Sequence, residues 1–133
     1  MNAKPFLDTN ILIYAFASGE PRAARAEELL AAGGIVSVQV LNEFVNVSRK
    51  KLGRSWAEIE EMLAALDVLL APPLPVTHEL HRAALGIARD HMLGFYDALI
   101  AAAANTAKCE TLYSEDMQDG LKVGETRIRN PFV

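Results

Sequence analysis

Short apolar runs of strand length alternate with longer segments of helical periodicity along this chain. The apolar runs are Phe6–Leu7, Ile35–Val38, Leu74–Val76 and Thr111–Tyr113. Between each run and the next, the spacing of apolar residues predicts two helices. Near the C-terminus, the alternation of Thr126–Arg129 predicts an edge strand that ends before Pro131.

The predicted helices carry recognisable start and stop signals. Ser55 and Glu58 form a capping box, and Gly33-Gly34 stops the second helix. After the capping box, apolar residues recur every three or four positions, which indicates a core face or a partner surface. The first predicted helix begins at Ile11, and the next three span Arg22–Ala32, Gln39–Leu52 and Trp56–Leu70. The fifth runs from the Thr77 cap to Gly94, and the sixth covers Ala98–Ala104 with Asp97 at its start.

This order of elements predicts an α/β fold, a three-layer sandwich in which helices flank a short-stranded, mainly parallel sheet. The chain has 133 residues, of which 51% are hydrophobic, so residues 1–133 are expected to form one domain with a sizeable core. Met1–Asn10 does not resemble a signal peptide, and no long apolar run follows. We therefore expect a soluble, cytoplasmic protein without membrane contact.

Four acidic residues are predicted to meet at one edge of this sheet. Asp8 and Asp116 follow strands, and ligand sites in such sheets lie at the carboxyl ends of the strands. Glu43 and Asp97 lie near helix starts that point to the same edge. Two of these acids also have a structural interpretation: Asp8 could cap a helix, and Glu43 could favour a helix N-terminus by its charge.

Carboxylates gathered at one edge repel each other, and a hard divalent cation would relieve that repulsion. Mg²⁺ and Mn²⁺ prefer oxygen ligands, and a bound ion makes water more acidic and stabilises charge on a phosphoryl oxygen. These acids therefore suit the hydrolysis of a phosphodiester by a metal-activated water.

Composition removes several other classes of site. Cys109 is the single cysteine, so an intramolecular disulfide and a cysteine-rich zinc site are excluded. His78 and His81 could share one helix face, but no third soft ligand is near them, so they are interpreted as surface residues. The net charge of −4 predicts no bulk attraction to nucleic acid, so RNA binding would need a local basic rim. The alternative interpretation of such basic residues is that they are solvated charges. The candidates for the basic rim are Arg49, Lys50, Lys51, Arg54, Lys122, Arg127 and Arg129.

Four motifs in this order resemble those of PIN-domain ribonucleases, and most closely the VapC-type toxins of bacterial toxin–antitoxin pairs. The motifs are Phe6–Asn10, Asn42–Phe44, Tyr96–Ala102 and Ser114–Asp116, and the resemblance covers nearly the whole chain. It implies a PIN-like fold, Mg²⁺- or Mn²⁺-dependent endoribonuclease activity on RNA, an antitoxin partner and a homodimer.

By position, the resemblance implies that Asp8, Glu43, Asp97 and Asp116 are the catalytic, metal-binding acids. Thr9, Asn10 and Ser114 would be supporting polar residues. This chain departs from the family pattern in the last motif, where Glu115, Asp116 and Asp119 are all acidic. Asp116 follows Ser114 in the family's Ser/Thr-x-Asp pattern and is the expected fourth ligand, with Asp119 as the second choice.

Three other interpretations stay open at this level. A catalytically degenerate PIN domain would bind protein or RNA without cleaving. A haloacid-dehalogenase-like phosphatase also places an Asp after its first strand, but it needs a second Asp two residues later, where this chain has Asn10. A receiver-like phosphoacceptor would need an acidic pair upstream, and the segment before Phe6 has none.

Overall fold

A computed structural model describes residues 4–133. Residues 1–3, which belong to the stretch where no signal peptide is expected, lie outside the described residues. None of the helices within 4–133 is long and apolar enough to cross a membrane. The elements are β1 (Phe6–Leu7), α1 (Thr9–Ala15), α2 (Ala23–Ala32), α3 (Val38–Lys50), α4 (Trp56–Leu69), α5 (His78–His91), α6 (Phe95–Thr106), β2 (Thr111–Tyr113), β3 (Lys122–Val123) and β4 (Thr126–Arg129).

The sheet has the strand order β1-β2-β4-β3, in which β1, β2 and β4 are parallel and β3 is antiparallel to β4. Leu112 of β2 lies opposite Phe6 on one side and Ile128 on the other. All three side chains are buried, so the middle of the sheet is part of the core. The predicted α/β class with a mainly parallel sheet is therefore confirmed.

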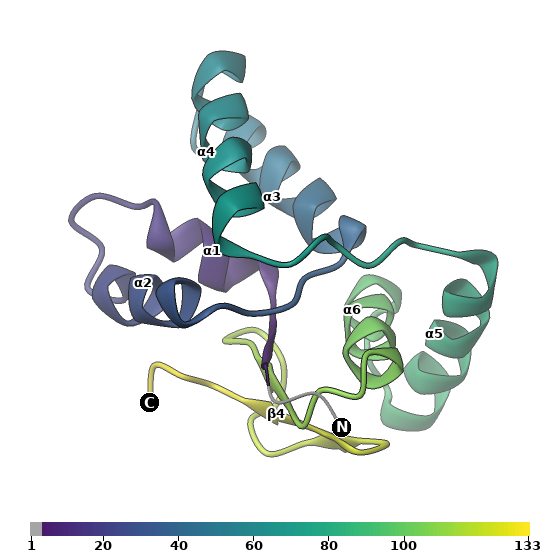
Figure 1. The fold of residues 1–133 in the computed structure, drawn as a ribbon. Coiled ribbons are helices and arrows are strands. Elements are labelled where there is room, and N and C mark those ends of the chain that lie inside the picture. The colour runs from purple at the N-terminus through teal and green to yellow at the C-terminus, as the bar shows by residue number, and fades with distance from the viewer. Residues whose placement is uncertain (1–3) are drawn as a thin grey trace.

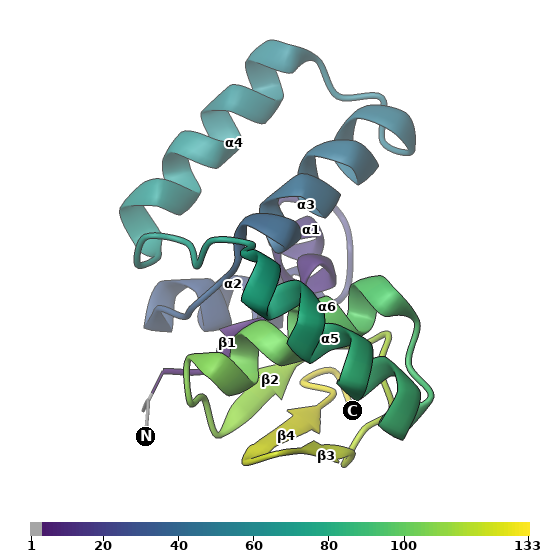
Figure 2. The ribbon, with the colours of Figure 1, turned by 90° about the vertical axis from the view of Figure 1, so that its right-hand side faces the viewer.

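Figure 1 shows α1 and α2 on one side of the strands and α5 and α6 on the other. Helices α3 and α4 form a pair that rises from this layered body, as the turned view in Figure 2 shows. Side chains from all the layers and from α3 and α4 join one buried apolar cluster. This arrangement is a three-layer sandwich with a projecting helical hairpin.

Helix α6 is the central buried helix of the fold. Every residue from Ala98 to Ala104 is buried, and five of these seven are alanines, whose small size lets α5 and the sheet approach closely. The helix begins at Phe95, three residues before the predicted apolar run that starts at Ala98, so Asp97 lies inside its first turn. That position directs a carboxylate to the N-terminal end of a buried helix.

Several predicted elements differ from the structure. Ile35–Val38 and Leu74–Val76 are reduced to single parallel bridges, Phe6 with Ile35 and Ser37 with Leu74, because α3 already begins at Val38. Lys122–Val123 is a strand that the sequence pattern did not show. It covers the outer side of β4, so β4 is an interior strand and the prediction of an edge strand is wrong.

Two apolar side chains of the predicted helices are exposed: Leu52, for which the spacing predicts an inward orientation, and Trp56, whose stripe is interpreted as a core face or a partner surface. Leu52 follows the C-terminal end of α3, where the chain turns, and 46% of its surface is exposed. Trp56, the first residue of α4, is 56% exposed, and its ring lies against the Arg49 guanidinium of α3 at 4.9 Å. Ile59, Met62, Leu66 and Leu70 are the residues of that stripe that are buried in the core.

Candidate active site

Asp8 is placed by the turn that connects β1 to α1. It caps α1: its Oδ1 accepts a hydrogen bond from the Thr9 backbone N–H at 2.7 Å. Its Oδ2 accepts a second hydrogen bond from the Ser114 hydroxyl at 2.7 Å and a longer one from Asn10 Nδ2 at 3.4 Å. Asp8 is 3% exposed. The interpretation of Asp8 as a helix cap is therefore confirmed, and its second oxygen faces Ser114 and Asn10.

Asn10 and Ser114 connect the turn after β1 to the loop after β2. Asn10 Nδ2 donates to Asp116 Oδ2 at 3.2 Å, and Asn10 Oδ1 accepts from the Glu115 N–H at 3.2 Å. Ser114 Oγ accepts from the Asp116 N–H at 3.2 Å while donating to Asp8. These bonds bring Asp8 and Asp116 to one place, although 108 positions separate them in the sequence.

Glu43 reaches the same place from α3. Its Oε1 accepts a hydrogen bond from the Thr9 hydroxyl at 3.2 Å, and its Oε2 accepts one from Gln39 Nε2 at 3.0 Å. Phe44 beside it is buried, as expected, but Asn42 on its other side is exposed. Glu43 therefore lies at the boundary between the buried and the exposed face of α3, where a carboxylate can face both Thr9 and solvent.

The four acids lie within each other's electrostatic field. Burial raises the pKa of Asp8 to about 7, against the opposing effect of hydrogen bonds from Ser114 and Thr9, and the charges of Glu43 and Asp97 raise it further. Burial also raises the pKa of half-buried Asp97, and the charges of Glu43 and Asp116 act in the same direction. Burial and the neighbouring acids thus disfavour the ionised forms of Asp8 and Asp97.

The loop after β2 holds three acids, and the structure separates their environments. Asp119 Oδ1 accepts a hydrogen bond from the Asn130 N–H at 2.8 Å and so joins this loop to the C-terminal segment. Glu115 accepts a hydrogen bond from the Tyr14 hydroxyl and pairs with Arg22 Nε at 3.0 Å. Asp116 is therefore the acid of this loop that faces Asn10 and the other site carboxylates.

The contact between Tyr14, Arg22 and Glu115 was missed by sequence reasoning. The Arg22 guanidinium lies over the Tyr14 ring at 4.8 Å from its centroid and donates to the Tyr14 hydroxyl at 2.9 Å. We call these three residues the clasp. Because the backbone N–H of Glu115 also binds Asn10, the clasp fixes a neighbour of Asp116. The one sequence signal for it was the surplus acid in the fourth motif.

The chemistry of these side chains fits a hard divalent cation. Every candidate ligand is a carboxylate, and a hydroxyl or amide hydrogen bond orients Asp8, Glu43 and Asp116. A cation would remove the repulsion that raises the pKa of Asp8 and Asp97. As the side chains stand, residues 4–133 contain no group of three or more Asp, Glu, His or Cys arranged to hold an ion. The acids would therefore have to draw closer on binding.

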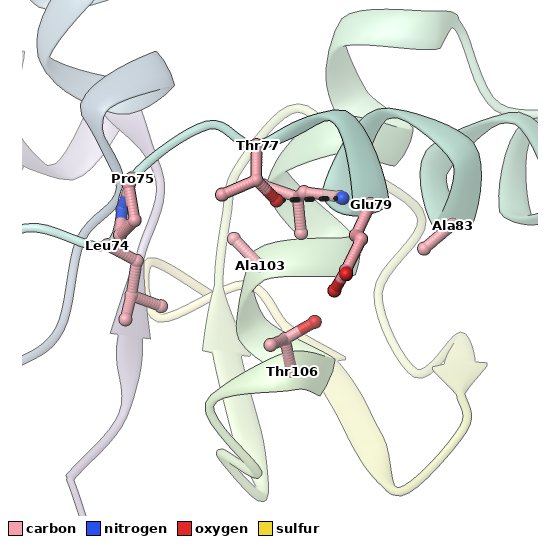
Figure 3. Close-up of a pocket in the computed structure, with 8 residues that line it drawn as sticks. Leu74, Pro75, Thr77, Glu79, Ala83, Ala103 and Thr106 are labelled. Atoms are coloured by element: carbon pink, nitrogen blue, oxygen red, sulfur yellow. Dashed lines mark hydrogen bonds between the residues drawn. The ribbon is translucent and has the colours of Figure 1, made fainter.

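A hollow of about 520 Å³ lies at this site and opens to solvent; its lining includes Glu43, Tyr96 and Asp97. Another pocket, of about 450 Å³, lies where the Leu74–Pro75 segment meets α5 and the C-terminal half of α6 (Figure 3). Its lining is mostly apolar, and Figure 3 shows its acid, Glu79, pointing toward the hydroxyl of Thr106. The acids near Asp97 are at the opposite end of α6, so the first hollow is the candidate active site.

Residues 6–119 match the family model of the PIN domain. The fold is similar to a chain in a toxin–antitoxin complex from Klebsiella pneumoniae, with a TM-score of 0.73, 23% identity, and 97% of this chain and 98% of that chain covered. It is also similar to VapC20 of Mycobacterium tuberculosis, described as a toxin that cleaves the sarcin–ricin loop, with a TM-score of 0.69, 21% identity, and 85% and 92% covered.

A third similar structure is VapBC2 from Rickettsia felis bound to a DNA fragment from its promoter, with a TM-score of 0.69 and 20% identity. That match covers 94% of this chain and 96% of the other chain. No curated protein sequence matches this chain.

Proposed function

The chain belongs to the PIN domain family, and from this premise we propose that it is a metal-dependent endoribonuclease that hydrolyses RNA phosphodiester bonds. The observation that supports the activity is the convergence of Asp8, Glu43, Asp97 and Asp116 beside one open hollow. The similar toxin that is described as cleaving the sarcin–ricin loop supports RNA as the substrate class. The family match leaves the phosphatase interpretation without support.

In this proposal the four acids hold Mg²⁺ or Mn²⁺. When bound, the ion supplies a more acidic water and stabilises charge on the phosphoryl oxygen. The residues around the acids provide orientation: the Ser114 hydroxyl directs Asp8, Asn10 directs Asp116, and the Thr9 hydroxyl directs Glu43. Oriented carboxylates lose less freedom when an ion binds, which raises affinity.

We further infer a role as the toxin of a toxin–antitoxin pair, acting in the cytoplasm as a homodimer built from one nuclease domain per chain. Structures of similar fold that are described as toxin–antitoxin assemblies support this role. A hollow of about 470 Å³ combines the apolar Ile13, Ala17 and Leu52 with the charged Glu20, Arg54 and Glu58, and it is the candidate seat for an antitoxin segment that carries both apolar and charged residues. A catalytically degenerate PIN domain that only binds protein or RNA is the second candidate function. A measurement of RNA cleavage distinguishes it from an active endoribonuclease.

The decisive measurement is cleavage of a panel of RNAs with Mn²⁺ or Mg²⁺ and with EDTA. Wild type should cleave with the ion and stop in EDTA. Asp8→Asn and Asp97→Asn should each lower the rate by at least about a hundredfold, because removing one oriented carboxylate weakens ion binding. Asp67→Asn, an exposed acid on α4, is the matched control and should cleave like wild type. Activity that persists in EDTA, or in Asp8→Asn, would refute the proposal.

The same assay decides the fourth ligand. Asp116→Asn should lose activity like Asp8→Asn, whereas Asp119→Asn should retain most of it, since an asparagine oxygen can still accept the bond from Asn130. Circular dichroism of each variant checks that the fold is intact. The reverse result would assign the fourth position to Asp119.

A further inference from the structure

A strip of polar and charged residues runs along one face of α3, from the active-site hollow toward α4. Residues spaced three or four apart lie on the same face of a helix. The opposite face, with Val40, Phe44 and Ser48, is buried. The other face, which we call the exposed strip, consists of the exposed Asn42, Asn46, Arg49 and Lys50 together with the partly buried Gln39 and Glu43.

Two hollows along this strip adjoin each other, because two residues line both of them. The hollow at the active site, about 520 Å³, includes Asn42 and Asn46 in its lining. A second hollow of about 440 Å³ is lined by the same two asparagines and continues to Arg49, Lys50 and Trp56. We call the combined hollow the α3 groove. From Glu43 to Arg49 it follows six residues of helix, or about 9 Å along the axis.

The α3 groove has an exposed aromatic ring at each end. Tyr96, beside Asp97, is 65% exposed, and Trp56 is 56% exposed. The Arg49 guanidinium lies over the Trp56 ring at 4.9 Å from the centroid and donates to the Arg54 carbonyl at 3.1 Å. The aromatic platform at the far end is therefore held in place by an arginine that is itself anchored.

Charge changes sign along the α3 groove. Glu43 and Asp97 make the active-site end acidic, and Arg49 and Lys50 make the other end basic. The middle is formed by the neutral side-chain amides of Asn42 and Asn46, which both donate and accept hydrogen bonds. The net charge of the chain is −4, so a polyanion would be attracted here by the local basic end and not by the molecule as a whole.

We propose that the α3 groove binds single-stranded RNA and leads it to the active site. This inference rests on the proposed nuclease function. Unpaired bases stack on aromatic rings and on arginine guanidinium planes, which Tyr96, Trp56 and Arg49 provide. Asn42 and Asn46 contact base edges, and Arg49 and Lys50 neutralise phosphates upstream or downstream of the cleaved bond.

The features favour a single strand over a duplex. In an RNA duplex the bases are stacked on each other and paired, so their faces are not available to protein rings. An intact duplex would leave Tyr96 and Trp56 without a stacking partner. The substrate class selected by this surface is therefore an unpaired segment, either a single strand or the loop of a folded RNA.

The test is fluorescence anisotropy with a labelled single-stranded RNA of mixed sequence and about twelve nucleotides, in EDTA. Trp56→Leu should raise Kd about tenfold, because it removes one stacking platform while keeping apolar surface. Trp56→Phe, which restores an aromatic face, should recover most of the affinity. A duplex of the same sequence should bind more weakly and should respond little to either change.

A charge arm uses two exposed helix arginines. Arg49→Ala should weaken binding and reduce the slope of log K against log salt concentration by about 0.7, the value for one lost phosphate contact on a single strand. Arg82→Ala, on α5 and outside the α3 groove, is the matched control and should leave both quantities unchanged. Equal effects of the two variants would show that Arg49 acts only as a general surface charge and would overturn its proposed contact with an RNA phosphate.

Photocrosslinking with 4-thiouridine RNA locates the strand directly. Crosslinks on Tyr96, Trp56 or the exposed strip of α3 support the proposal, and crosslinks confined to β3 and β4 overturn it. If Trp56→Leu binds RNA like wild type but disrupts a protein complex, the surface is a protein interface and the proposal is wrong. Failure of the proposed nuclease function would be a separate outcome. In that case wild type would cleave no RNA with Mn²⁺, whatever the binding measurements showed.

Discussion

Asp8 combines a structural and a chemical role in one buried carboxylate. It caps α1 through Thr9 and accepts the hydroxyl of Ser114, yet burial dominates and raises its pKa to about 7. A buried acid of this kind is more stable protonated than ionised. The native structure is therefore under electrostatic stress near neutral pH, and a cation would relieve it.

This stress predicts the pH dependence of metal-free stability. Between the ordinary Asp8 pKa of 3.8 and the native value of about 7, the native state keeps a proton that the unfolded state has released. The free energy of unfolding should therefore fall as pH rises through this window, by up to about 4 kcal/mol at 1.36 kcal/mol per pKa unit. Urea unfolding in EDTA from about pH 4 to pH 8 measures the slope.

Asp8→Asn is the comparison for this slope. The variant has no titrating group at this position, so its stability should change much less over the same pH window, with a smaller residual slope from Asp97, whose pKa is also raised. An equal slope in the two proteins would show that burial of Asp8 is not its cause.

At the scale of elements, the clasp joins the α1–α2 region to the loop that carries Asp116. Tyr14 is in α1, Arg22 directly precedes α2, and Glu115 follows β2. Arg22 also neutralises a surplus acid one residue from a proposed ligand. Without Arg22, Glu115 would be an unpaired negative charge beside the site, and its loop would lose one anchor.

Arg22→Ala should therefore lower activity about tenfold and change the Mn²⁺ concentration needed for half-maximal rate, while costing no more than about 1 kcal/mol of stability, as expected for a partly exposed pair. Arg25→Ala is the matched control: Arg25 lies in α2 and pairs with Glu28 at 3.5 Å on the surface. Cleavage against Mn²⁺ concentration, together with thermal melts, measures both effects. Identical metal dependence for the two variants would limit the clasp to a packing role.

At the scale of the whole molecule, residues 4–133 include exposed apolar side chains on several helices. Val68 and Leu69 are exposed on α4, and Leu85 is exposed on α5. Exposed apolar surface that gathers into patches marks interfaces. The proposed homodimer and antitoxin partner would each cover part of this surface.

Light scattering at micromolar concentration should give about twice the chain mass of 14.5 kDa. Co-expression with the neighbouring gene should yield a small co-purifying protein that suppresses RNA cleavage. A monomeric mass would refute the homodimer, and a neighbour that neither binds nor inhibits would refute the antitoxin pairing.

The local patterns of the sequence determined the α/β class, the order of most elements and the capping residues. Helix periodicity, the capping box at Ser55 and the polar ends of strands all act within a few residues, so they can be identified without a fold. The sequence also indicated Asp8 and Asp116, since the carboxyl ends of parallel strands share one edge of a sheet, and Glu43 and Asp97, since the helices that carry them were predicted to start at that edge.

Only the tertiary structure decided features that depend on partners far apart in the sequence. The backbone of Asn130 binds Asp119, Arg22 pairs with Glu115, and Asn10 binds Asp116, although all three acids lie in one short loop. The pairing of β3 with β4 likewise depends on a register that the alternation of four residues does not specify. Trp56 matched a core stripe by spacing, but periodicity gives the face of a helix and not what covers that face.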